Sequence, residues 1–81
     1  MSIMNIEKKL INYLKKYSKQ KINQNTNLIE KELIDSFGIV ELISFIENSL
    51  KLNCPISKVS TSNFKNIKSI IKFLKNNNKK V

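Results

Sequence analysis

The chain has 81 residues, of which 41% are apolar, and it carries a formal net charge of +9. At this length it forms one small domain, which buries roughly 60% of the surface that its unfolded chain exposes. With no histidine, one cysteine and one glycine, the sequence excludes Cys/His zinc sites, histidine-dependent catalytic pairs and glycine-rich phosphate loops.

The first expected element is an amphipathic helix near the N-terminus. Its apolar residues recur in steps of three and four, so they share one face, while most lysines fall elsewhere. These apolar residues are Ile3, Ile6, Leu10, Ile11, Leu14 and Tyr17. Residues 19–34 have no sustained period and are rich in polar residues, which predicts a long connection. It is expected to attach to the core through Leu28, Ile29, Leu33 and Ile34.

A second helix is expected to begin at Asp35 or Ser36, either of which can cap it. Its apolar stripe comprises Phe37, Val40, Ile43 or Leu42, Ile46 and Leu50. Because apolar residues occupy more than half of its circumference, we expect this helix to be the most buried. Pro55 cannot continue a helix and Asn53 suits a turn, so the segment "NCPIS" is expected to end it.

The C-terminal third predicts a short turn or helix near residues 57–63 and then a last helix. Asn66 is the expected cap, Phe64 lies just ahead, and the buried face comprises Ile67, Ile70, Ile71 and Leu74. No segment has a strand pattern. The predicted fold class is all-α, a small four-helix bundle with three main helices, one short helix and a long first loop. It forms a single domain over residues 1–81, ordered over about 2–75 and frayed over 76–81.

The charge of the chain is segregated around Ser36. Residues 22–50 hold five acids and one lysine, a net charge of −4, and the remaining residues have a net charge of +13. We call the five acids the acidic patch: Glu30, Glu32, Asp35, Glu41 and Glu47. Complementary potential would steer a basic partner to them. Lys, Ile and Asn make up 40 of the 81 residues, so the basic remainder is either a functional face or the product of coding bias.

Ser36 and Gly38 each have two interpretations. A serine at a helix start commonly caps the helix and does nothing more. Free N–H groups and the positive end of the helix dipole would also stabilise a phosphate ester on this hydroxyl. Gly38 either permits close approach by a partner or a prosthetic arm, or it is simply tolerated in the first turn.

The segment "LIDSFGIVELISFIE", with Ile56 and "FKNIKSIIKFL" in register, resembles the acyl carrier protein family and its peptidyl and D-alanyl carrier relatives. The resemblance extends from the first helix to about Leu74. It implies that Ser36 receives 4′-phosphopantetheine from coenzyme A through a separate Mg-dependent phosphopantetheinyl transferase. The thiol of that arm would hold an acyl or aminoacyl group as a thioester, as in fatty acid biosynthesis, and the carrier itself would catalyse nothing.

The resemblance also assigns residues to recognition. Asp35 would contribute to recognition by the transferase. Basic surfaces of acyl-loading and condensing enzymes would meet the second helix, at the partner-binding residues Phe37, Gly38, Val40, Glu41 and Glu47. Phe37 replaces the usual leucine of the family and Asn66 its usual threonine, and the chain is far more basic than most members. A monomer is the simplest expectation.

Two alternatives from other classes stay open. Fifteen lysines and a pI of about 9.9 fit a nucleic-acid-binding module, although there is no arginine to read guanine and few aromatics are left for stacking. The first helix would alternatively act as a basic amphipathic anchor on an anionic membrane.

The remaining residues have plain interpretations. Cys54 is expected to be a small apolar loop residue, and a single cysteine without a secretory signal favours the cytoplasm. Aromatic residues Tyr13, Tyr17, Phe45 and Phe73 are expected to pack in or on the core. Leu28, Leu33 and Val40 either line a space for an acyl chain or close an ordinary core.

Overall fold

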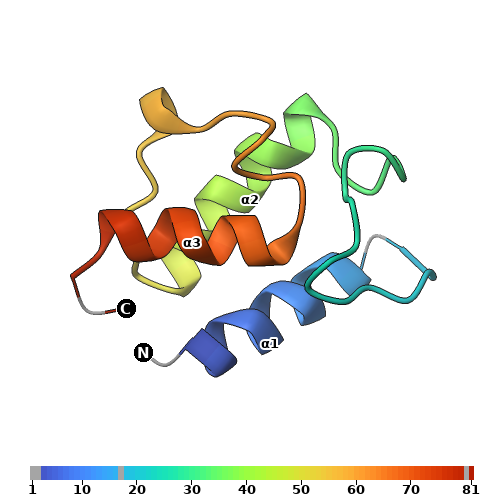
Figure 1. Cartoon of the computed structure of the whole chain (residues 1–81), viewed down its shortest axis with the longest axis horizontal. Helices are drawn as coiled ribbons and strands as arrows, with labels where there is room; N and C mark the ends of the chain where they lie inside the picture. Colours follow the sequence, from blue (N-terminus) through green and yellow to red (C-terminus); the bar gives the residue numbers. More distant parts are fainter. Residues whose placement is uncertain (1–2, 17, 80) are drawn as a thin grey trace.

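The computed structural model describes residues 3–16, 18–79 and 81. It contains three α-helices, α1 (Ile3–Lys15), α2 (Ser36–Ser49) and α3 (Ile67–Asn77), and a single-turn 3-10 helix, η1 (Ile56–Lys58). Within the described ranges there is no strand, so the all-α prediction and the order of the elements are confirmed (Figure 1). Among the same residues, no helix combines the length and apolar character that a membrane crossing requires.

The helix α1 buries the face that the spacing predicts. Ile6 and Leu10 have no exposed surface and Leu14 is 3% exposed, whereas Ile3 stays 42% exposed at the edge of the stripe. Tyr17, the last residue of the expected stripe, lies outside the described residues. The buried face of α1 packs against α3, which lies beside it in Figure 1.

The most buried helix is α3, which corrects the expectation that α2 would be. Its buried residues are those predicted, together with Phe73: Ile67, Ile70, Ile71, Phe73 and Leu74. The predicted cap is confirmed, because Oδ1 of Asn66 accepts a 2.7 Å hydrogen bond from the Ser69 N–H. Just ahead of α3, Phe64 is fully buried and meets Phe73 edge to face with 5.8 Å between ring centroids.

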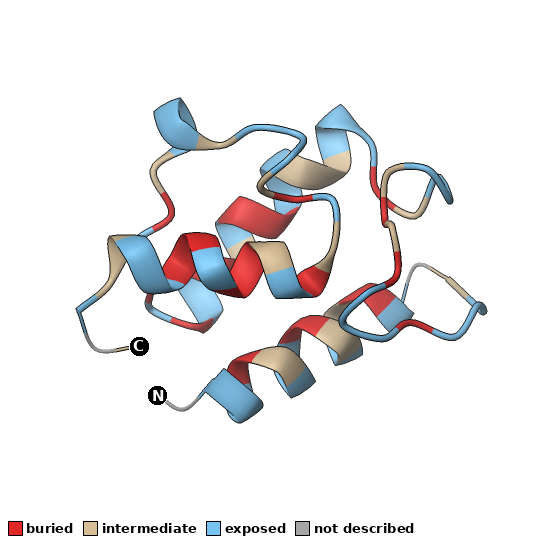
Figure 2. Cartoon of the chain, viewed as in Figure 1, coloured by how far each residue is buried: buried red, intermediate tan, exposed pale blue. Residues whose placement is uncertain are grey.

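The N-terminal half of α2 projects from the core. Leu42, Ile43 and Ile46 are buried, but Phe37 is 71% exposed and Val40 is 52% exposed. The core stripe expected for this helix was therefore wrong at these two positions. Because apolar residues surround more than half of α2, spacing alone does not decide which side meets the core. Figure 2 shows the first turn of α2 in the colour of exposed residues.

The segment after α2 turns earlier than expected. The helix ends at Ser49, before "NCPIS", and Lys51 has a positive φ of 58°, which turns the chain. Asn53 does not end the helix but forms two hydrogen bonds with Asn78, just after α3. The Asn53 N–H donates to Oδ1 of Asn78 at 2.7 Å, and Nδ2 of Asn78 donates to the Asn53 carbonyl at 2.9 Å. Hydrogen bonds to the core segment therefore continue as far as Asn78.

The long connection of residues 19–34 is held by turns and by α3. Oδ1 of Asn27 accepts hydrogen bonds from the backbone N–H groups of Ile29 and Glu30. The apolar residues pack as predicted, with Leu28 and Ile34 buried and Ile29 and Leu33 half-buried against the core. Two backbone bonds tie the connection to the start of α3, from Leu28 N–H to the Lys65 carbonyl at 2.7 Å and from Lys68 N–H to the Gln24 carbonyl at 3.1 Å.

Candidate functional site

Ser36 opens α2, and the residue before it makes the capping bond. Asp35 has an extended backbone, and its Oδ1 accepts a 2.7 Å hydrogen bond from the Gly38 N–H. Of the two residues that the sequence offered as the N-cap, it is therefore Asp35 that fills this role. Ser36 is not needed as a cap, and its side chain is exposed. Its hydroxyl lies at the positive end of the helix dipole, where an attached phosphate is stabilised.

The packing of the chain itself accounts for Gly38. A Cβ atom at this position would lie 3.0 Å from Cγ1 of Ile34 and 3.3 Å from Oδ1 of Asp35. Ile34 is buried, and Oδ1 of Asp35 is the capping atom, so neither can yield without a cost to the fold. The glycine lets the end of the long connection fold closely onto the first turn of α2, a reason that neither sequence interpretation included.

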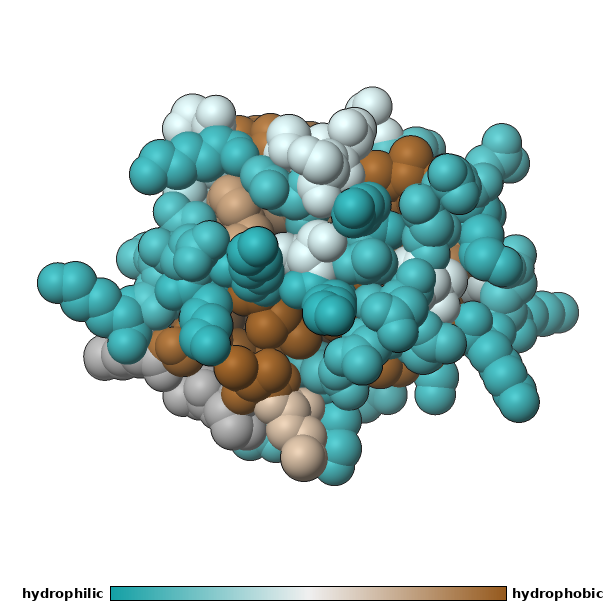
Figure 3. All heavy atoms as spheres, in the orientation of Figure 1, coloured by the Kyte–Doolittle hydropathy of each residue, from teal (hydrophilic) through white to brown (hydrophobic). Residues whose placement is uncertain are grey.

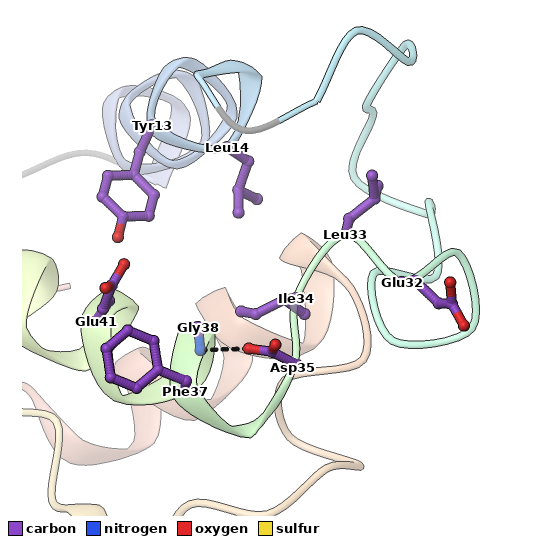
Figure 4. A pocket seen from close by; sticks show the side chains of 9 residues that line it. All are labelled: Tyr13, Leu14, Glu32, Leu33, Ile34, Asp35, Phe37, Gly38 and Glu41. Carbon is purple, nitrogen blue, oxygen red and sulfur yellow. Dashed lines mark hydrogen bonds between the residues drawn. The ribbon is translucent and has the colours of Figure 1, made fainter.

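A hollow between α1, the end of the long connection and the start of α2 gathers acidic side chains (Figure 4). Three residues of the acidic patch line it: Glu32, Asp35 and Glu41. Tyr13 of α1 and Glu41 of α2 point toward one another, and Phe37 lines the hollow beside them. Three carboxylates around one hollow produce a local negative potential on a chain whose net charge is positive.

Ser36 borders a second hollow, an apolar groove between α2 and the segment that contains η1. Besides Ser36, the groove is lined by Ile39, Val40, Ile43, Ile56, Val59, Ser60 and Thr61. Five of these side chains are aliphatic, and Ile56 is 63% exposed. The groove therefore offers an apolar surface to a flexible group attached to the Ser36 hydroxyl.

The acidic patch only partly surrounds Ser36. A third hollow, lined by Ser36 itself, also includes Glu32 and Asp35. Glu41 lines the hollow on the side of α1, as described above. Glu30 and Glu47 are exposed and line neither of these hollows. Glu47 lies about three turns along α2 from Ser36, near Cys54, so it is not a wall of the site.

The three residues suggested as the lining of an acyl space are not brought together. Leu28 is fully buried in the core, Leu33 lines the acidic hollow, and Val40 lines the apolar groove. Of the two interpretations, an ordinary core therefore holds for Leu28 and for Leu33, which packs against that core.

The sequence interpretation also missed Ile39, Ile56 and Val59 in the groove. For Ile39 a signal existed, since it follows Ser36 by three residues, as Val40 does by four, and both therefore lie on the same face of a helix as the serine. No comparable signal existed for Ile56 and Val59, because tertiary packing alone places their segment beside α2.

Cys54 has the environment of a structural residue. It is 1% exposed, and burial, with a further contribution from the negative charge of Glu47, raises the pKa of its thiol to about 11. The thiol is therefore protonated at neutral pH and is a poor nucleophile. The interpretation of Cys54 as an apolar residue is confirmed. Phe45 and Phe73 also pack with the core, where Phe45 stacks on Tyr13 with 4.4 Å between ring centroids.

Comparison with known proteins identifies no family for this chain. No protein-family model matches the chain, and no curated protein matches it significantly.

Proposed function

We propose that this chain is a carrier protein of the acyl carrier type, with an acyl-carrier-like four-helix fold and Ser36 as the site of modification. A separate Mg-dependent transferase moves 4′-phosphopantetheine from coenzyme A to the serine. The Ser36 oxygen bonds to the phosphorus of the pantetheine phosphate, the pyrophosphate bond of coenzyme A breaks, and adenosine 3′,5′-bisphosphate leaves. The observation that carries the proposal is that Asp35 makes the capping bond, so the adjacent Ser36 hydroxyl is exposed and available.

The surroundings of Ser36 support an attached arm. The phosphodiester would lie at the start of α2, where free N–H groups and the helix dipole favour a negative charge. The apolar groove lined by Ile39, Val40 and Ile56 would receive the arm or the acyl group that its thiol carries as a thioester. The carrier itself would catalyse no step, because loading and transfer belong to the partner enzymes.

The exposed side of α2 supports docking of those partners. Phe37 and Val40 are exposed apolar residues next to Ser36, and Glu41 and Glu47 are exposed acids on the same helix. A partner surface that carries basic side chains around a small apolar patch would complement this arrangement. Gly38 is half-buried and explained by packing, so we give it no direct contact with a partner.

The test is modification in vitro. Incubated with coenzyme A, Mg²⁺ and a promiscuous phosphopantetheinyl transferase, the full chain should gain one phosphopantetheine by intact mass. Ser36→Ala should abolish the gain. Ser44→Ala is the matched control, because Ser44 is an exposed serine on the same helix, where its hydroxyl accepts a bond from Nδ2 of Asn48. A folded parent chain that gains no mass, or a Ser36→Ala variant that is still labelled, would contradict the proposal.

A further inference from the structure

A row of lysines occupies the outward side of α3 and continues at both of its ends. Its members follow one another in steps of three or four residues: Lys65, Lys68, Lys72, Lys75 and Lys79. This spacing places the three lysines within the helix on one side, and all five side chains are exposed. Residues 51–81 contain eight lysines and no acid. No acidic side chain of this segment therefore offsets the row, and Glu7 is the one acid in the sequence of α1, the helix that packs against α3.

Exposed apolar side chains lie in the neighbouring helix. Ile3 is 42% exposed and Met4 is 67% exposed, both in the first turn of α1. α1 packs along α3, and the start of α1 lies at the same end of the molecule as the end of α3, in the lower left of Figure 1. Figure 3 shows apolar atoms at the surface in the lower part of this view, with hydrophilic side chains above them and to their right. Positive charge and exposed apolar side chains thus lie on two helices that pack against each other.

We propose that these two sets of side chains form one face, which docks the folded protein on an anionic lipid bilayer. Lysines near a negatively charged leaflet are attracted to it, and apolar side chains beside them gain by entering the headgroup region. If the lysines bound a nucleic acid instead, the two apolar residues would gain nothing, because the phosphates attract only the positive charges and Ile3 and Met4 would remain in water. The face also has no arginine, because the chain contains none, and guanine readout depends most often on arginine.

This docking differs from the membrane anchor that the sequence suggested. There the apolar stripe of the first helix would enter the bilayer, but Ile6, Leu10 and Leu14 are buried in the core. In the present proposal the domain stays folded and lies on the surface through α3 and the start of α1. The start of α2, which is Ser36, lies away from the start of α1 and the end of α3 (Figure 1), so the proposal is independent of the function of Ser36.

The test is co-sedimentation of the full chain with phosphatidylcholine vesicles that contain or lack phosphatidylglycerol, at about 0.15 M salt, where the Debye length is about 8 Å. The anionic vesicles should bind the protein at least about tenfold more tightly. The triple variant Lys68→Gln, Lys72→Gln, Lys75→Gln should lower the partition coefficient about 100-fold, since each lysine at the surface contributes roughly fivefold. Met4→Ser should lower it roughly fivefold.

The matched control removes the same charge elsewhere. Lys19→Gln, Lys21→Gln, Lys31→Gln changes three exposed lysines of the long connection, outside the lysine row, and it should lower binding clearly less than the triple variant of α3 does. Each variant must give the same thermal melting curve as the parent. Four outcomes would overturn the proposal: equal binding to neutral vesicles, equal losses in the two triple variants, parent-like binding of Met4→Ser, or tighter binding of a short DNA duplex or single strand at the same salt.

Discussion

The hydrogen bond of Asp35 gives the most direct test of how α2 begins. The bond from the Gly38 N–H to Oδ1 is 2.7 Å long, and its acceptor is an exposed carboxylate at the positive end of the helix dipole. Asp35→Ala removes the cap, at a cost of about 1 kcal/mol, and the favourable charge, at a cost of about 0.5 kcal/mol. A loss of about 1.5 kcal/mol in the free energy of unfolding lowers the Tm of a domain this size by about 6–12 °C.

Asp35→Asn separates the two contributions. Asparagine caps as well as aspartate does, so only the charge is lost and the Tm should fall by about 2–4 °C. Thermal unfolding followed by far-UV circular dichroism measures both changes. Glu41→Gln is the control, because it removes an exposed charge of the same helix that makes no cap, and it should change stability by less than about 0.5 kcal/mol. Equal Tm values for Asp35→Ala and Asp35→Asn would refute the assignment of Asp35 as the N-cap.

Three further predictions concern the core and its edges. Asn78→Ala removes both bonds to the backbone of Asn53 and should lower the free energy of unfolding in urea by about 1–2 kcal/mol; an unchanged midpoint would contradict the structural role of this pair. Phe64→Ala should lower the free energy of unfolding by about 3–5 kcal/mol, because Phe64 is fully buried. Phe37→Ala should lower it by less than about 0.5 kcal/mol, because Phe37 is 71% exposed. Similar urea midpoints for the two variants would disprove the burial described for α2. The raised pKa of Cys54, about 11, means that folding keeps the thiol protonated where an unfolded cysteine, with a pKa near 8.5, ionises. This contribution to stability is complete below about pH 8.5 and is lost as the pH rises toward 11. Cys54→Ala should therefore abolish the fall in the free energy of unfolding between about pH 8.5 and 11, measured by urea unfolding. If the variant shows the same fall, groups other than Cys54 cause it.

The parts of the fold that the sequence predicted well have a single apolar stripe. In α1 and α3, apolar residues recur on one side and lysines occupy the other, so spacing decides both the helix and its buried face. The same pattern fails for α2, because apolar residues surround most of it. Phe37 and Val40 therefore fit a core stripe by spacing, although the fold leaves them in solvent.

The candidate site was predictable where its features are local. Asp35, Ser36 and Gly38 lie within one helical turn, and the sequence identified all three as the start of a helix. It did not decide which of Asp35 and Ser36 makes the cap, since both side chains have a suitable oxygen. The far wall of the groove, at Ile56 and Val59, depends on how a segment 20 residues further along the chain returns to α2, and no local pattern carries that information.

The bonds from the long connection to the backbone at Lys65 and Lys68 also have a consequence for biosynthesis. The ribosome synthesises the long connection well before it synthesises Lys65 and Lys68, whose backbone groups bond to that connection. During translation, the segment before Ser36 therefore lacks these two hydrogen bonds until the first turn of α3 has left the ribosome. An enzyme that recognises the folded loop would act on chains that have reached α3 and would pass over shorter nascent ones.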